Sequence, residues 1–392
     1  MNNVKESAKA INGKITEWRR HIHANPELGM ELPKTEAYIV QKLKEMGVEK
    51  IRQGVAGHGV VALIEGKQPG KVLGIRADMD ALNMEEGTDL PFAAKNGWMH
   101  ACGHDAHVAM LLGAAELLMQ CRDDLKGSVK LIFQPSEENG LGAAAMIKEG
   151  VMENPKVDGV IGLHTGNLWK GAAAGGIGYR FGPMLAATDW VSATFNGHGG
   201  HGATPHLTVD PISIACQVQT LLQTIVSREV SPTAPAVLSI CMINGGTANN
   251  VIPQSCTIKG TLRSLIPEVR KHLQDRFTQV CEEVAHAMRG SATVEIVKSQ
   301  PALVNNRDMT EKLRAAAAAV LGDDCVHEIQ EPAMGGEDMA YFLEKAPGTF
   351  FSHPSNFGDE RDFPHHHPRF NLNEDVLWTG AATFVQFALT WQ

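Results

Sequence analysis

The chain has 392 residues, of which 43% are hydrophobic and 20% charged, and its formal net charge is −9 at pH 7. This length is too great for one simple core, so we expect two domains. The acidic balance and the lack of a Lys/Arg-rich block argue against nucleic acid or an anionic membrane as a partner.

The sequence shows neither a clear signal peptide nor a clear membrane-spanning segment. Residues 1–21 lack an uninterrupted apolar core and predict an amphipathic helix rather than a signal peptide. The longest nearly apolar stretch, residues 108–119, contains Glu116 and is too short to span a bilayer. Neither feature predicts a signal peptide or a membrane span.

The predicted elements of the first half alternate between strands and helices. Strands alternating with helices predict an α/β sheet with both faces covered. In chain order we expect a helix at 36–46, strands at 60–65 and 71–75 joined by a turn at GKQPG, a buried helix at 108–120, a strand at 129–133, a helix at 143–149 and a strand at 157–163.

From about residue 184 the order changes to strand, helix, two strands, helix and strand, which is the order of a ferredoxin-like α/β sandwich. We therefore predict an inserted domain at 184–297, within a larger domain formed by 1–183 and 298–392, where 315–319 is a helix-favouring alanine run. The expected elements of the insertion are a strand at 189–195, a helix at 211–228, strands at 236–243 and 255–262, a helix at 267–288 and a strand at 292–297.

The cysteine pattern does not suggest disulfides. The seven cysteines are an odd number, are irregularly spaced and include no CxxC pair, so we expect a reducing cytoplasm and no disulfide framework. Six of them should be small buried hydrophobic residues. Cys102 differs because it lies in His100-Ala-Cys-Gly-His104-Asp-Ala-His107. Thiolate and imidazole both suit ions of the Zn²⁺ class, so this cluster predicts a metal site.

Carboxylates and further imidazoles follow other predicted strands. Glu137 and Glu138 come shortly after the strand at 129–133, and His164 ends the apolar strand VIGLH. Adjacent glutamates are commonly solvated surface charges, but ligands of open α/β sheets collect at the carboxyl ends of strands. One glutamate could then bind metal while the other acts as general base. Three consecutive histidines at 365–367 also favour metal binding, although chemistry alone leaves open which one binds.

The inserted domain carries a second polar set. Residues 196–206 form a glycine-rich loop that contains His201, and glycine permits close approach by a ligand. A flexible loop with exposed histidines is an equally good reading of this segment by itself. Asn250 could serve turn chemistry, and Arg263 could be a surface charge on a strand edge.

Taken together, these motifs resemble one family, that of hippurate hydrolases, auxin-conjugate hydrolases and aminoacylase-like binuclear metallopeptidases. The resemblance runs from about Trp18 to Asn373 and rests on motifs that occur in the family's order: RHIHANPE, RADMDAL, HACGHDAH, QPSEENGLGAA, GLH, GGHGATPH, GGTANNVIP, GTLR, GGED and HHHPRF. It implies a zinc-peptidase-like catalytic domain with a mixed sheet covered by helices, and an inserted ferredoxin-like lid that also forms a dimer or higher homo-oligomer.

The resemblance also implies roles for single residues. Glu137 matches the general acid/base, and Cys102 matches a ligand that bridges two metals. His201 matches a lid group that contacts the substrate carbonyl, which dimerisation could bring to the neighbouring subunit's site. The matching metal ligands are Cys102, His104, Glu138, His164 and His366, and the matching substrate-binding residues are Asn250 and Arg263.

The expected reaction is metal-dependent hydrolysis of the amide bond of N-acyl amino acids. Two divalent ions per subunit are expected, with Zn²⁺, Mn²⁺ and Co²⁺ all open. A dipeptidase or carboxypeptidase with the same centre is the alternative, and a catalytically silent metal-binding protein is disfavoured because Glu137 is present. The sequence departs from the family pattern at Asn139, where Gly is usual, and at Met339, where an aromatic residue is frequent. These departures leave substrate preference open.

Overall fold

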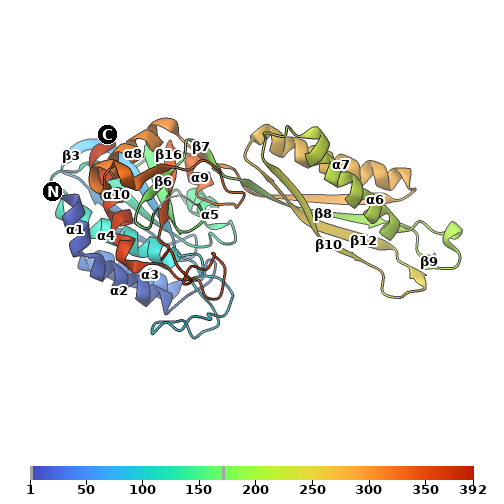
Figure 1. The fold of residues 1–392 in the computed structure, drawn as a ribbon, viewed down its shortest axis with the longest axis horizontal. Helices are drawn as coiled ribbons and strands as arrows, with labels where there is room; N and C mark the ends of the chain where they lie inside the picture. The colour runs from blue at the N-terminus through green and yellow to red at the C-terminus, as the bar shows by residue number, and fades with distance from the viewer. Residues whose placement is uncertain (1–2, 170–172) are drawn as a thin grey trace. The chain divides into compact units, whose positions relative to one another are not determined.

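The computed structural model describes residues 3–169 and 173–392, and tertiary contacts divide the chain into two units (Figure 1). Unit 1 consists of Met1–Met184, Val304–Ala333 and Asp338–Gln392, and unit 2 of Leu185–Leu303 and Met334–Glu337. The chain thus leaves the first unit after Met184, builds most of the second, returns at Val304, and contributes Met334–Glu337 to the second unit before it ends in the first.

A mixed β-sheet forms the centre of unit 1. Parallel pairing of β4 with β3, β3 with β5 and β5 with β16 makes its middle, while β1 and β2 add an antiparallel edge. In spatial order its strands are β1 (Lys50–Val55), β2 (Gly59–Glu65), β4 (Lys126–Gln134), β3 (Gln68–Asp78), β5 (Gly159–Gly166), β16 (Gly348–Pro354), β6 (Ile177–Tyr179) and β15 (Val326–Glu328). A short pair, β7 (Gly182–Leu185) and β14 (Leu303–Asn305), stands apart from it.

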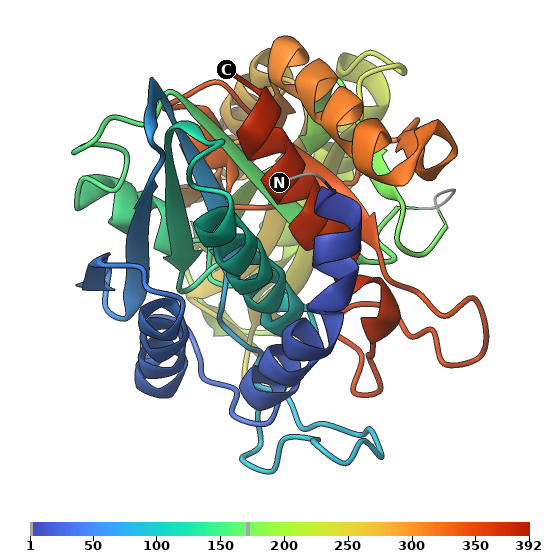
Figure 2. The same ribbon diagram turned by 90° about the vertical axis from the view of Figure 1, so that its left-hand side faces the viewer.

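Helices cover both faces of this sheet. Helix α4 (His104–Gln120) is almost entirely buried because it is apolar on every side, and α1 (Val4–Ala10), α2 (Asn12–His23) and α10 (Leu377–Thr390) pack around it (Figure 2). On β5, Leu163 lies against α10, whereas a Cβ at Gly162 would meet Met339 beside α9 (Ala340–Leu343), so α9 covers the opposite face. The other α-helices among the described residues of this unit are α3 (Pro33–Glu45), α5 (Gly142–Lys148) and α8 (Arg307–Leu321), and short 3-10 helices lie at Asp323–Cys325 and Glu374–Val376.

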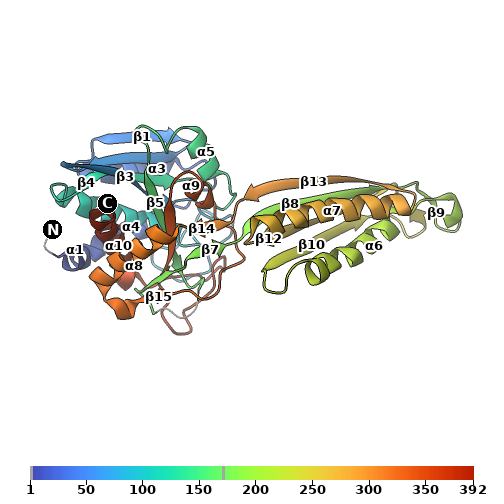
Figure 3. The ribbon, with the colours of Figure 1, turned by 90° about the horizontal axis from the view of Figure 1, so that it is seen from above.

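Unit 2 is a four-stranded antiparallel sheet with helices on one face (Figure 3). Its order in the chain is β8 (Ala187–Asn196), α6 (Pro211–Thr224), β10 (Ala236–Gly245), β12 (Ser255–Ser264), α7 (Pro267–Ala287) and β13 (Ser291–Gln300), with a π-helical turn at Ile225–Glu229. The spatial order β10-β12-β8-β13 is that of a ferredoxin-like sheet. A second small pair, β9 (Gly200–His201) and β11 (Val251–Ile252), adjoins the end of the sheet where β12 begins.

The α/β fold prediction is confirmed, and three local expectations need correction. The expected N-terminal helix is two helices broken at Ile11. The expected turn at 66–70 is largely part of β3, and β4 lies between β2 and β3, because the sheet pairs strands that are distant in sequence. All seven cysteines are free thiols, but only Cys102 and three of the other six are buried. Cys216 and Cys241 are exposed and Cys325 is half-buried, since α6 and β10 each present one face to solvent.

Candidate metal centre and active site

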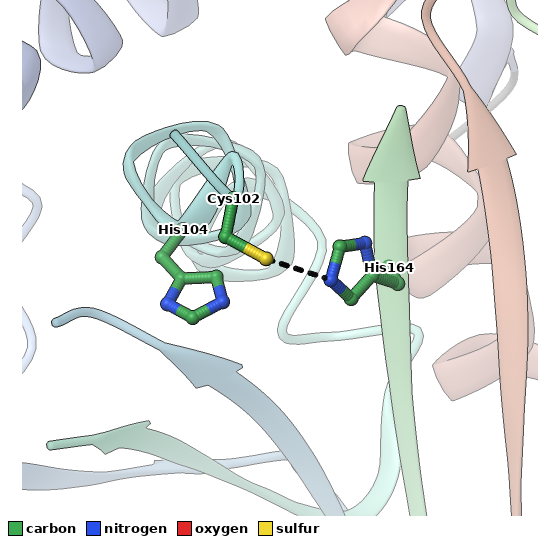
Figure 4. A group of neighbouring side chains, drawn as sticks. All are labelled: Cys102, His104 and His164. Atoms are coloured by element: carbon green, nitrogen blue, oxygen red, sulfur yellow. Dashed lines mark hydrogen bonds between the residues drawn. The ribbon is translucent and has the colours of Figure 1, made fainter. Parts of the chain in front are cut away.

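The loop before α4 places a thiol and an imidazole side by side. Gly103 has a φ of 89° and immediately precedes α4, which begins at His104. A Cβ at this position would lie 2.7 Å from Thr165 Cγ2, so only glycine permits this close turn between Cys102 and His104. Cys102 Sγ lies 3.4 Å from Nε2 of His164, which comes from β5 (Figure 4).

The hydrogen bonds of the two histidines leave one nitrogen of each available to a metal. His164 Nδ1 donates to the carbonyl oxygen of Thr165 at 2.8 Å, and His104 Nδ1 donates to that of Asp80 at 2.9 Å. An imidazole whose Nδ1 proton is held by a carbonyl presents Nε2 as the ligating atom. His104 Nε2 is buried and has no hydrogen-bond partner among the described residues.

The two glutamates are positioned by a turn after β4. Ser136, just before them, has a φ of 59°. Asp80 Oδ1 accepts the backbone N–H of Glu137 at 3.0 Å, and its Oδ2 accepts that of Glu138 at 3.1 Å. This clamp aims both carboxylates at the Cys/His cluster.

The triple histidine contributes one side chain to the same place. His366 Nε2 lies 3.5 Å from Glu138 Oε1. His365 instead hydrogen-bonds through Nε2 to the carbonyl oxygen of Thr165 at 3.0 Å, and His367 stacks on Phe363.

The potential ligand atoms form overlapping groups, in each of which all atoms lie within 4.8 Å of one another. Two of these groups, Cys102–His104–His164 and Cys102–Glu138–His366, share Cys102, whose thiolate would be the common ligand of two ions. A third group, His104–Glu137–Glu138, contains both glutamates. The described residues therefore bring all five expected ligands and the expected general base together. Two further groups of this kind, Asp78–His104–His107 and Glu137–Glu337–Asp338, overlap with these three.

The electrostatics of the cluster fit cations. Burial, with Glu138 nearby, raises the pKa of the Cys102 thiol well above its ordinary range. Burial alone would lower the pKa of His104, yet the carboxylates of Asp78 and Asp80 raise it well above its ordinary range. The first shift means that the thiolate needs added positive charge to form, and the second reports surplus negative charge around the imidazole. Divalent ions would satisfy both demands, so this donor set of sulfur, nitrogen and oxygen fits a metal centre.

The sequence motifs placed His107 in a predicted metal site but did not predict the buried layer of hydrogen bonds that it forms behind the ligands. His107 donates from Nδ1 to Asp78 Oδ1 at 2.5 Å and accepts the backbone N–H of Thr165 through Nε2 at 2.9 Å, so both its nitrogens are engaged. Arg76 bonds Asp78 at 2.7 Å and Asp338 at 2.8 Å. The signal that could have revealed this layer is the pair of carboxylates, Asp78 and Asp80, at the carboxyl end of a central parallel strand.

The expected substrate residues all lie in unit 2, but at two different ends of it. His201 pairs with Val251 across β9 and β11, and Asn250 adjoins it through its carbonyl, which accepts the N–H of Gly202 at 2.9 Å. Arg263 lies eight residues along β12 from Ser255, the end near β9. At about 3.3 Å per residue this separates Arg263 from His201 by roughly 26 Å or more. The unit therefore brings His201 and Asn250 together but not Arg263.

His201 and Arg263, at these two ends, can make different contacts. His201 is exposed, and its Nδ1 accepts the N–H of Ala203 at 3.0 Å, so its Nε2 carries a proton that it can donate. The Arg263 guanidinium lies over the Trp190 ring at 5.4 Å, and its buried Nη1 has no hydrogen-bond partner in the described ranges.

An α/β sheet with a centre for two metal ions, beside a glutamate suited to proton transfer, defines a metal-dependent hydrolase. Comparison with known proteins makes this more specific. Residues 74–390 match peptidase family M20/M25/M40. An N-acetyl-L-cysteine deacetylase of Bacillus subtilis is 42% identical over 92% of this chain and 83% of its own length. Thermostable carboxypeptidase 1 of Saccharolobus solfataricus is 38% identical over 98% of this chain and 97% of its own length.

A solved structure shows the same fold. The YXEP protein of Bacillus subtilis, described as a dinuclear metal-binding peptidase of the M20 family, has a TM-score of 0.84 and 35% identity over 97% of this chain and 98% of that one. The chain therefore belongs to peptidase family M20/M25/M40 and is a metal-dependent enzyme that hydrolyses amide bonds, which confirms the family and reaction type predicted from the motifs. No helix in the described ranges combines the length and apolarity needed to cross a bilayer.

Proposed function

We propose that this enzyme hydrolyses the amide bond of N-acyl amino acids, releasing a carboxylic acid and a free amino acid. The observation that carries the proposal is the pair of ligand groups sharing Cys102, with Glu137 in the adjoining group. The name of the Bacillus subtilis N-acetyl-L-cysteine deacetylase supports an acylated amino acid as substrate.

The proposed ligands are Cys102, His104, Glu138, His164 and His366. Two divalent ions bound there would polarise the amide carbonyl and lower the pKa of a water molecule. Zn²⁺, Mn²⁺ and Co²⁺ all suit a site with one thiolate, three imidazoles and one carboxylate.

The protein's own groups then move the proton and orient the substrate. Glu137, held by the Asp80 clamp, accepts a proton from the attacking water and delivers it to the departing amine, which is otherwise a poor leaving group. The Nε2–H of His201 donates to the oxygen that becomes negative as the carbonyl carbon turns tetrahedral. Asn250 orients the amide, and Arg263 binds a substrate carboxylate by a charge-assisted hydrogen bond.

Two substitutions in the glutamate pair test this assignment. Glu137→Gln keeps the shape of the side chain but cannot accept the proton, so turnover should fall about 10²- to 10⁴-fold while both metals stay bound. Glu138→Ala removes a ligand and should lose metal as well as activity. Near-normal turnover in purified Glu137→Gln protein would overturn the assignment of the general base.

A carboxypeptidase activity is the second candidate, and the relative of that name supports it. Both reactions use the same centre and differ only in the acyl group on the carbonyl side of the scissile bond. Turnover of acetyl-, benzoyl- and aminoacyl-amino acids, measured with each metal returned to apo-protein, separates them. Preference for aminoacyl substrates would replace the N-acyl proposal.

We further propose that unit 2 is a lid through which two chains form a dimer, and that His201 completes the partner's site. The separation of roughly 26 Å or more between His201 and Arg263 supports this, because one small substrate cannot reach both in a single chain. In a dimer, Arg263 of one chain and His201 of the other could flank the same substrate. The edge strands of the unit 2 sheet, β10 and β13, could pair across a two-fold axis.

Subunit mixing tests the dimer. Inactive His201→Ala and Glu137→Gln chains, refolded together, should regain about a quarter of wild-type activity, because half the dimers are mixed and each has one intact site. Mixed dimers isolated with two different tags and found inactive would show that His201 acts within its own chain.

A cytoplasmic location is also proposed. Its support is the cysteine content: seven free thiols, two of them exposed, are typical of a reducing compartment. Cell fractionation would test it.

A further inference from the structure

One of the proposed metal ligands has little side-chain packing to hold it. The side chain of His366 is 52% exposed, whereas His104 and His164 are buried. Its backbone has a φ of 62°, in the left-handed region that non-glycine residues seldom adopt and that persists only where the surroundings impose it. The backbone around His366 must therefore be held from outside.

In addition to the bond between His365 and the carbonyl oxygen of Thr165, two backbone hydrogen bonds hold this segment, one at His366 itself and one at Pro368. The N–H of His366 donates to the carbonyl oxygen of Ala101 at 2.9 Å, and the carbonyl oxygen of Pro368 accepts the N–H of Gly87 at 2.8 Å. The first bond leads to the loop that carries Cys102. The second leads to the segment 83–98, which contains no helix or strand.

That segment is tied to the core through Glu86. Its Oε2 accepts the N–H of Ala94 at 2.7 Å, and its Oε1 accepts the Thr88 hydroxyl. The same Oε1 lies 3.1 Å from Nε2 of His23, the last residue of α2. These hydrogen bonds to the Glu86 carboxylate therefore connect the segment 83–98 internally and to α2.

His23 in turn connects this segment to α4. Its Nδ1 lies 2.8 Å from Oδ2 of Asp105, in the first turn of α4, and the side chains of His23, Glu86 and Asp105 are all 0% exposed. A buried imidazole held by a carboxylate at each nitrogen is rigid. The contacts thus run from α4 through His23 and Glu86 to Gly87, then to Pro368, two residues after His366.

We propose that the His23–Glu86 pair is a positioning device for His366, and through it for one of the two metal ions. The inference rests on the proposed function, in which His366 is a ligand. Neither residue touches the proposed ligand groups, so both act at a distance. Loss of the pair should weaken binding of the ion held by Glu138 and His366. Binding of the ion held by His104 and His164 should not change.

The test measures metal binding rather than turnover. Apo-protein is titrated with Zn²⁺ against a chromogenic chelator, and the affinities of the two sites are resolved. Glu86→Ala should lower the affinity of one site about 10- to 100-fold, as loss of a residue that orients a ligand typically does, and leave the other site unchanged. Glu86→Gln, which can still accept the Ala94 N–H, should lose less.

Glu36 offers a matched control. It also accepts one backbone N–H, that of Gly54 at 2.7 Å, and also bonds a histidine, His58, at 2.5 Å. These bonds tie α3 to the turn at 54–58 and do not lead to Pro368. Glu36→Ala should leave both zinc affinities unchanged, and thermal unfolding of the apo-proteins shows whether the two alanine variants lose similar stability.

A double-mutant cycle decides whether the effect passes through His366. In a His366→Ala background, Glu86→Ala should change zinc affinity by no more than about twofold, because its effect has already been removed. An equal loss in both backgrounds, a loss at both sites, or a loss no greater than in Glu36→Ala would overturn the proposal. If His366→Ala itself keeps both ions, the proposed ligand set is wrong, and this outcome is distinct from failure of the positioning pair.

Discussion

Replacing Asp80 with asparagine tests how the glutamate pair is held in place. Asp80 is 1% exposed, and its two carboxylate oxygens accept the N–H groups of Glu137 at 3.0 Å and Glu138 at 3.1 Å. Asparagine has the same shape but presents an NH₂ group in place of one oxygen. That NH₂ would face a backbone N–H, so one hydrogen bond is lost and two donors oppose each other.

The magnitude follows from these contacts. A hydrogen bond to a charged group contributes about 1.5–3 kcal/mol, and a buried N–H left unpaired costs about 1–3 kcal/mol more. Burial raises the pKa of Asp80, with Glu138 adding to the effect, so removing its charge recovers part of this cost. A net loss of about 2–4 kcal/mol is expected, which corresponds to roughly 30- to 1,000-fold in kcat/KM if it falls on the placement of Glu137.

The assay is steady-state hydrolysis of an acetyl-amino acid at saturating metal, with metal content and thermal unfolding measured on the same samples. Asp158→Asn is the control, because Asp158 Oδ2 also accepts a backbone N–H, that of Val72 at 2.9 Å, but not one from the glutamate turn. A folded, metal-loaded Asp80→Asn enzyme within about threefold of wild type would refute the role of the clamp.

Further outcomes are expected at other sites. Among single alanine variants of the triple histidine, His366→Ala should lose the most metal and activity because only its imidazole reaches Glu138, and a more severe His365→Ala or His367→Ala would refute this register. Lys130→Met should lower the free energy of unfolding by about 2–4 kcal/mol, measured in urea, since its buried ammonium donates to three backbone carbonyls at 2.7–2.8 Å; an unchanged midpoint would contradict this. Burial alone would lower the pKa of His23, but Asp105 and Glu86 raise it above 6.5. The charge of His23 therefore stabilises the fold fully below pH 6.5, and this stabilisation is lost as pH rises through the folded-state pKa. The stability gap between wild type and His23→Gln should therefore narrow at alkaline pH, and a gap that widens would contradict this sign.

Local pattern was sufficient for much of the architecture. The apolar run at 108–119 predicted a buried helix because its residues are apolar on every side of a 3.6-residue period, and α4 is buried in this way. The order of elements after residue 184 predicted the ferredoxin-like unit, because connections of that length leave few alternatives. Donor side chains at the ends of predicted strands indicated a metal centre, since those ends meet at one edge of an α/β sheet.

Pairing between distant segments was decided only in three dimensions. The sequence could not place β4 between β2 and β3, because hydrogen bonds of the backbone are the same whichever strand supplies them. The clamp on the glutamates joins residues 57 positions apart, and the ligating nitrogens of His104 and His164 depend on which carbonyl holds the other nitrogen. The distance between His201 and Arg263 follows from the register of β12. Residue type and local period determine which atoms can bind a metal or move a proton, whereas the tertiary contacts determine which of them meet.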